Sequence, residues 1–116
     1  MQYLLLLHGE ENRWTTMTPE QQQQGMAAYG AFTQALTASG ALKSSDRLQP
    51  AASATTVRVV DGKSQVLDGP YADTKEQLGG YFLIDVADLD AALTWAARCP
   101  GASHGAVEVR PVWVAG

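Results

Sequence analysis

A dense polar turn that runs directly into an apolar strand constrains this chain most. The segment is Asp68–Phe82 (DGPYADTKEQLGGYF), and it continues into the largely apolar residues 83–86. Asp, Gly and Pro favour turns through side-chain hydrogen bonds, a free φ and a fixed φ respectively. The paired Gly79 and Gly80 let the backbone approach a ligand or a neighbouring strand closely. The segment therefore predicts a turn that leads the chain into a sheet and holds polar groups beside it.

Length and composition limit the class of protein. A chain of 116 residues has room for one domain, residues 1–116, with one core. The net charge is −4 and the basic residues are scattered, so we expect no direct nucleic-acid binding and no membrane attachment. The apolar run Tyr3–Leu7 is too short for a signal sequence, and Cys99 is the single cysteine. We therefore expect a cytoplasmic protein.

Helix signals bracket two segments. Thr18 and Gln21 form a capping-box pattern with Pro19 at the first helical position, and Gly40 is a helix stop. Asp88 caps a second helix that ends at the Pro-Gly pair 100–101. The apolar faces of the two helices are predicted to consist of Met26, Tyr29, Phe32 and Leu36, and of Leu89, Ala92, Leu93 and Ala96.

Strand signals occupy much of the remaining chain, apart from a polar loop expected at Gly9–Arg13. Asp61-Gly62 is a two-residue hairpin turn, since both residue types tolerate positive φ. The predicted strands are Gln2–His8, Ala54–Val60, Lys63–Asp68, Gly80–Val86 and Ala106–Val114.

This order of elements predicts an α+β fold: a ferredoxin-like sandwich with two helices on one face of a mostly antiparallel sheet. The other face would then be uncovered, too apolar for water and too charged for a core. Packing it against the same face of a second copy solves this problem, so we expect a homodimer. The residues expected on the uncovered face are Tyr81, Leu83, Asp85, Glu108, Arg110 and Val112.

Seven short segments, spread over nearly the whole chain, carry a family resemblance: YLLLL at 3–7, AYGAF at 28–32, LQP at 48–50, ATTVR at 54–58, DGPY at 68–71, TKEQLGGY at 74–81 and VEVRPV at 107–112. With these segments the chain resembles the YCII-related family, specifically its DGPF-domain branch. Tyr71 stands where the branch's Asp-Gly-Pro-Phe motif has phenylalanine.

The resemblance implies a dimeric α+β barrel of ferredoxin-like type. Activity varies across the family: relatives on this barrel include small degradative enzymes, and DGPF proteins are similar to proteins linked to alternative sigma factors. One branch is proposed to use a His–Asp pair whose histidine lies early in the first helix. The corresponding stretch here, Thr18–Gln24, contains no histidine.

Several residues are candidates for acid–base chemistry or anion binding. Asp68 is either a rigidly held carboxylate or a residue that only orders its turn, and Lys75 is a cation suited to an anionic group. His8 ends a strand before an acidic loop, where a proton-transfer residue would fit. Arg110 either pairs with Glu108 or offers its fork to a substrate carboxylate. Tyr81 on the same face is a further ligand contact.

We therefore expect a small-molecule pocket at the sheet and dimer interface, with Asp68 or His8 as the acid–base residue. Lys75, Arg110 and Tyr81 would bind a small polar or anionic metabolite. No redox cofactor and no metal are expected, because no two ligand-type residues stand at the spacing of a known metal site. The alternative is a non-catalytic sensor or accessory protein, linked to sigma-factor regulation.

Overall fold

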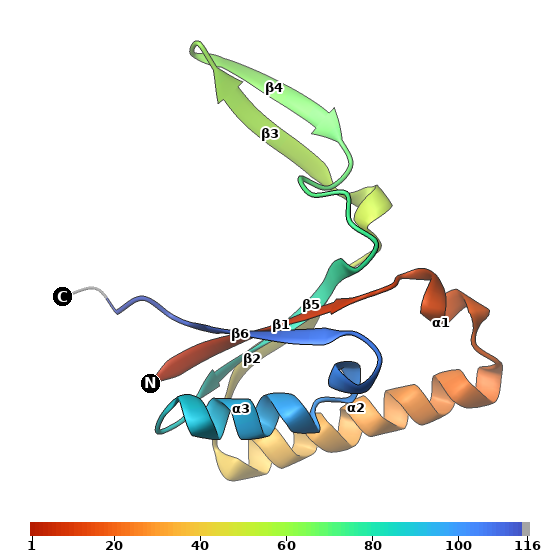
Figure 1. Ribbon diagram of the computed structural model, residues 1–116, viewed down its shortest axis with the longest axis vertical. Helices are drawn as coiled ribbons and strands as arrows, with labels where there is room; N and C mark the ends of the chain where they lie inside the picture. Colours follow the sequence, from red (N-terminus) through yellow and green to blue (C-terminus); the bar gives the residue numbers. More distant parts are fainter. Residues whose placement is uncertain (115–116) are drawn as a thin grey trace.

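A four-stranded antiparallel sheet with helices on one face forms the body of the protein, and a separate two-stranded hairpin stands away from it (Figure 1). The computed structural model describes residues 1–114. The elements are β1 (Gln2–Gly9), α1 (Asn12–Thr16), α2 (Pro19–Ser39), β2 (Leu42–Arg47), η1 (Ala51–Ser53), β3 (Thr55–Val60), β4 (Lys63–Asp68), β5 (Gln77–Asp85), α3 (Leu89–Arg98), η2 (Pro100–Ser103) and β6 (Ala106–Pro111).

The body sheet has the strand order β2-β5-β1-β6, and each neighbouring pair is antiparallel. Helix α2 connects β1 to β2, and α3 connects β5 to β6, so each helix crosses over the same face. This is the ferredoxin-like arrangement, and the expected α+β class is confirmed. None of the described helices has the length and apolarity needed to cross a bilayer.

The sequence did not predict β2, and it placed the hairpin in the main sheet. The structure corrects both points: β2 is the edge strand of the body, whereas β3 and β4 pair only with each other. Strand β2 has the sequence LKSSDR, with one apolar residue, and it pairs with β5 on one side only. An edge strand that buries little carries little apolar periodicity, so its sequence gives a weak signal.

Local capping signals set the boundaries of the helices. The Thr18 hydroxyl accepts a hydrogen bond from the Gln21 N–H (3.2 Å), and the Gln21 side chain accepts one from the Thr18 N–H (3.0 Å). Gly40 ends α2 in the left-handed region at φ 81°, and Asp88 caps α3 by accepting from the Ala91 N–H (2.9 Å). The three N–H groups in these hydrogen bonds are satisfied within the chain, as the capping patterns predicted.

The first loop is more ordered than expected. Strand β1 extends to Gly9, and the short helix α1 begins at Asn12, within the segment Gly9–Arg13 that was predicted as a loop. Helix α1 contains no buried residue, so no apolar stripe marks it in the sequence.

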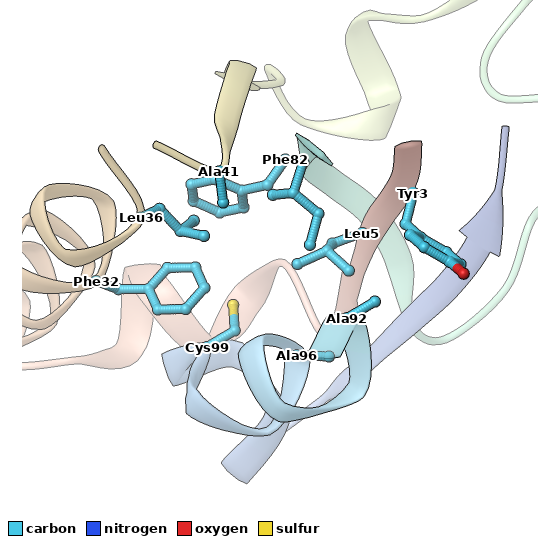
Figure 2. Packing of buried hydrophobic residues seen from close by; sticks show 10 residues of the cluster. Tyr3, Leu5, Phe32, Leu36, Ala41, Phe82, Ala92, Ala96 and Cys99 are labelled. Atoms are coloured by element: carbon cyan, nitrogen blue, oxygen red, sulfur yellow. The ribbon is translucent and has the colours of Figure 1, made fainter. Parts of the chain in front are cut away.

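The core lies between the body sheet and the two long helices (Figure 2). Leu5, Leu36 and Ile84 are fully buried, from β1, α2 and β5 respectively. The Phe32 ring meets the Phe82 ring edge-on, with centroids 5.1 Å apart. Such perpendicular aromatic pairs add about 0.5–1.5 kcal/mol beyond the apolar area that they bury.

The helix faces differ from their prediction at three residues. Met26 is 63% exposed, and Leu89 and Leu93 are about half exposed. Ala92 and Ala96 of α3 contact the core as predicted, and Trp95 and the helix-ending Cys99 join them in place of the two leucines. The stripe of α3 that contacts the core is rotated because the small alanines let the helix approach the sheet, while the leucines lie at its margin.

Candidate functional site

The face of the body sheet that points away from the helices carries a mixture of apolar and charged side chains. Register places Leu6 of β1 opposite Tyr81 of β5 on one side and Glu108 of β6 on the other. Leu4 lies in the same way between Leu83 and Arg110. Because side chains alternate along a strand, these six residues share one face, opposite the buried face. The expected composition of the uncovered face is correct for the four of them that were named.

A single carboxylate joins a guanidinium and an imidazole on this face. The Nε2 atom of His8 lies 3.2 Å from Oε1 of Glu108, and Arg110 donates a short hydrogen bond to Oε2 of the same carboxylate. The guanidinium, and then His8, hold the pKa of Glu108 below its ordinary value. Glu108 therefore stays ionised between its two partners, and the Glu108–Arg110 pairing that the sequence suggested is present.

This chain of three side chains suits proton transfer. When Nε2 of His8 carries the proton, it donates to Glu108 and the other ring nitrogen is left as an acceptor. A carboxylate that fixes the orientation and tautomer of an imidazole is a recurring feature of general-base sites. The His8 side chain is 31% exposed, so it is sheltered by the sheet yet reachable by a small molecule.

A second polar pair lies across Leu6. The Tyr81 hydroxyl donates a hydrogen bond to Oδ2 of Asp46 on β2, at 2.8 Å. The Asp46 carboxylate raises the pKa of Tyr81 because it accepts the phenolic proton. Tyr81 and Glu108 both neighbour Leu6, so the two polar pairs are separated by about two strand spacings, on the order of 10 Å. That separation is of the size of one small ring compound.

Asp46 was missed by sequence reasoning because β2 itself was missed. Its signal was only one acid in a polar segment after a helix stop. Glu108 was named solely as the partner of Arg110, since its contact with His8 joins residues 100 positions apart in the chain.

The structure places Asp68 and Lys75 apart from this group. Asp68 is the exposed last residue of β4, in the separate hairpin sheet. Lys75 is 85% exposed and forms an ion pair with Glu10 (Nζ–Oε1 3.2 Å), in the loop after β1. His8, Arg110 and Tyr81 are thus brought onto one face, and the two motif residues are not.

An open hollow of about 400 Å³ lies where the motif loop meets the loop after β1. Lys75 and Asp73 line it from the motif, and Glu10 and Glu11 line it from the other side. Glu11 is also structural, because its carboxylate accepts a hydrogen bond from the Ala51 N–H at 2.7 Å. Among residues 1–114, no group of three His, Cys, Asp or Glu side chains is arranged to hold a metal ion.

Comparison with known proteins places the fold in context. Over 114 residues the chain is 38% identical to an uncharacterised protein of Rhizobium meliloti (strain 1021), covering 97% of this chain and 92% of that protein. The solved structure of 5-chloro-2-hydroxyhydroquinone dehydrochlorinase (TftG) from Burkholderia phenoliruptrix AC1100, in complex with 2,5-dihydroxybenzoquinone, matches with a TM-score of 0.56. That match covers 100% of this chain and 96% of TftG at 16% identity, and it shows a shared fold.

A family model described as the YCII-related domain matches residues 1–115. Together with the relative from Rhizobium meliloti, this match shows that the chain belongs to the YCII-related family.

Proposed function

We propose that the open face of the body sheet binds a small polar or anionic molecule and that His8 transfers a proton to or from it. The observation that carries this proposal is the shared carboxylate of Glu108, which holds His8 and Arg110 together on the open face of the body sheet. A structural ion pair needs only Glu108 and Arg110. The added imidazole supplies a side chain that can donate or accept a proton.

Each side chain has a distinct role in this proposal. His8 is the acid–base residue, and Glu108 positions its ring. Arg110 has five N–H donors, of which Glu108 engages only part, so the rest of the fork is free to bind an anionic oxygen. Tyr81 is a second contact at the far side of Leu6, and it offers its hydroxyl oxygen while its proton goes to Asp46.

Lys75 and Asp68, the two candidate residues of the motif, have smaller roles in this proposal. Lys75 lies at the hollow beside the loop that follows His8, so it adds positive potential next to the site without touching it. Of the two acid–base candidates, His8 is favoured over Asp68. Its partners Glu108 and Arg110 are in contact with each other, whereas Asp68 is exposed in another sheet.

We further propose that the working form is a homodimer in which two open faces meet. Leu4, Leu6 and Leu83 are only half-buried in one copy, and they lie next to one another by register. Covering them with a second copy removes apolar surface from water and lowers the local dielectric around the Glu108 group. The first effect stabilises the dimer, and the second strengthens the attraction between Arg110 and an anionic group of the ligand, which offsets the cost of desolvating that group.

The bound molecule named for TftG suggests the ligand class. 2,5-Dihydroxybenzoquinone is a small, planar, acidic ring compound, and its two ionisable oxygens lie on opposite sides of the ring. A compound of this kind fits the separation between the Glu108–Arg110 pair and Tyr81. We therefore propose hydroxylated quinones and aromatic acids as the ligand class of this chain.

Calorimetric titration with 2,5-dihydroxybenzoquinone tests the proposal. We expect the wild-type protein to bind it. In a separate unfolding experiment, a hundredfold excess of the compound over its dissociation constant should raise the unfolding free energy by about 2.7 kcal/mol. Arg110→Gln should weaken binding roughly tenfold or more, as expected for loss of a charge-assisted hydrogen bond. Lys63→Gln, at the exposed hairpin tip, is the matched control and should bind as the wild type does.

His8→Gln separates catalysis from binding. In an enzyme, this variant keeps most of its affinity and loses turnover of 5-chloro-2-hydroxyhydroquinone, the compound in the name of TftG. Binding without turnover in the wild-type protein instead supports the alternative, a ligand-responsive accessory protein. If neither 2,5-dihydroxybenzoquinone nor a panel of small aromatic acids binds, or if Arg110→Gln binds them equally well, the proposed site is wrong.

A further inference from the structure

The hairpin of β3 and β4, which we call the arm (residues 55–68), carries an uncovered apolar face. Val57 pairs directly with Val66, and Val59 lies two residues further along β3 on the same face. These three side chains are 59%, 64% and 67% exposed, in the order Val57, Val66 and Val59. The opposite face carries Arg58, Gln65 and Lys63 together with the exposed Val60 and Leu67. The positive charges of the arm therefore lie on the face opposite Val57, Val59 and Val66, and the valine face is the one that a partner can cover without burying them.

A two-stranded hairpin with nothing against its apolar side is marginally stable in water. The arm extends away from the body (Figure 1), and the body supplies no cover for the three valines. Its strand register is nonetheless regular over six residue pairs. The three valines of the arm are therefore covered only when a surface of another molecule packs against them.

The dimensions of the chain indicate how large that surface is. The radius of gyration is 16.2 Å, against about 13 Å for a compact domain of this length. The exposed area is 8022 Å², whereas a compact monomer of this mass exposes about 6,100 Å². The excess is roughly 1,900 Å², and a stable protein interface takes only about 800 Å² from each partner. The surplus area is therefore large enough for a complete dimer interface.

The position of the arm identifies the partner as a second copy. The arm leaves the body next to the site, where Gln77 pairs with Gly9 and Leu78 pairs with His8. It rises on the side of the sheet away from α2 and α3 (Figure 1). Any molecule that covers the open face thus lies beside the arm. A second copy supplies an apolar sheet face and an arm of its own, so the same contact forms twice about a twofold axis.

We propose that the valine face of each arm packs against the other copy and holds it over the open face, so that the partner roofs the His8–Glu108–Arg110 group. This inference rests on the proposed function for the location of the site. In one copy alone the Arg110 side chain is 67% exposed, and the site is open to water. When the second copy packs over the open face, the site lies between the sheet of one copy and the sheet of the other. The arm is thus part of the site's construction, although its residues do not belong to the proton-transfer group.

Sedimentation equilibrium of two neighbouring variants tests the arm. Val66→Glu places a charge on the valine face, and Gln65→Glu places the same charge one residue away on the opposite face. We expect Val66→Glu to raise the dimer dissociation constant roughly tenfold or more, because an unpaired carboxylate would be buried. Gln65→Glu should stay within about twofold of the wild type. An unchanged dissociation constant for Val66→Glu overturns the inference.

Two further measurements keep the outcomes distinct. Should Val66→Glu lose its fold by circular dichroism, Val59→Lys repeats the test at a more exposed position of the same face. Leu83→Glu tests the open face itself. Dissociation by Leu83→Glu but not by the valine variants refutes the arm contact and leaves the proposed dimer intact. Dissociation by the valine variants, with no binding of 2,5-dihydroxybenzoquinone to the wild type, supports the arm and refutes the ligand site. A wild-type monomer refutes both.

Discussion

His8 and Glu108 meet diagonally across the pairing of β1 with β6, with Nε2 of His8 3.2 Å from Oε1 of Glu108. In the ladder Glu108 stands opposite Leu6, two residues before His8. Diagonal neighbours of this kind are within reach of long side chains. Arg110, two residues after Glu108 on the same strand, takes the other carboxylate oxygen. The geometry of one ladder therefore assembles a three-residue polar group from two strands at opposite ends of the chain.

The lowered pKa of Glu108 makes stability depend on pH in the acid range. Its folded-state pKa lies below the ordinary 4.5, so the ion pairs contribute stability that is present above pH 4.5. That contribution is lost as pH falls below 4.5 through the folded-state pKa. Urea unfolding between pH 3 and pH 6 should show this loss. Glu108→Gln should reduce the slope, and the part that remains belongs to groups such as Asp85, whose pKa is lowered by the N-terminal amine. Glu76→Gln, an exposed change in the motif loop, should keep the wild-type profile; a slope in Glu108→Gln equal to that of the wild type contradicts the assignment.

The Tyr81–Asp46 hydrogen bond predicts a shifted phenol titration. Because the Asp46 carboxylate accepts the Tyr81 proton, the pKa of Tyr81 is raised above its ordinary 10.0. Asp46→Asn removes the anion and should lower the pKa of Tyr81 toward 10.0, as followed by NMR of the ring carbons. Asp73→Asn is the control, since it removes a charge from the hollow and leaves β2 untouched. An unchanged titration in Asp46→Asn would show that the hydrogen bond does not form in solution.

The glycine pair of the motif should respond unequally to alanine. A Cβ at Gly80 would lie 2.9 Å from the Asp46 carbonyl oxygen, whereas a Cβ at Gly79 would lie 3.9 Å from the nearest atom, the Leu7 carbonyl oxygen. The backbone of a paired strand can move only slightly to relieve this contact. Gly80→Ala should therefore cost about 1–3 kcal/mol of unfolding free energy. Gly79→Ala should stay within about 0.5 kcal/mol of the wild type. Denaturant unfolding measures both, and equal costs would argue against the close approach of β2 to β5.

Helix α2 offers a paired test of the core. Leu36 is fully buried, and Met26, which was predicted on the same face, is 63% exposed. Leu36→Ala should cost about 2–5 kcal/mol because it removes buried methyl groups and leaves a cavity. Met26→Ala should change the unfolding free energy by less than about 0.5 kcal/mol. If the costs were similar, or if Met26→Ala shifted the dimer equilibrium, Met26 would have a covering surface that the single copy does not provide.

Several features were decided by residues adjacent in sequence. The Thr18–Gln21 capping box and the stop at Gly40 define α2, and Asp88 begins α3, because a cap is satisfied by backbone groups within four residues. The hairpin turn at Asp61-Gly62 has positive φ at both residues, as its residue types predicted. The alternation in β1, β5 and β6 likewise fixed which side chains share the open face, since the pleat has a period of two.

Tertiary structure alone decided how those parts meet. Strand β2 has one apolar residue and is recognisable as a strand only from its pairing with β5. Its residue Asp46 could therefore not be predicted from the sequence as part of the site. Asp68 ends the strand Lys63–Asp68 as predicted, yet that strand belongs to a separate sheet and not to the body, because strand partners depend on distant segments. The contact of His8 with Glu108 also joins distant segments. Sequence determined the ends of α2, the start of α3 and the hairpin turn through local hydrogen bonding and backbone conformation. Only the fold decided the pairing of strands, and with it the site, because register across a sheet is set by the packing of the whole core.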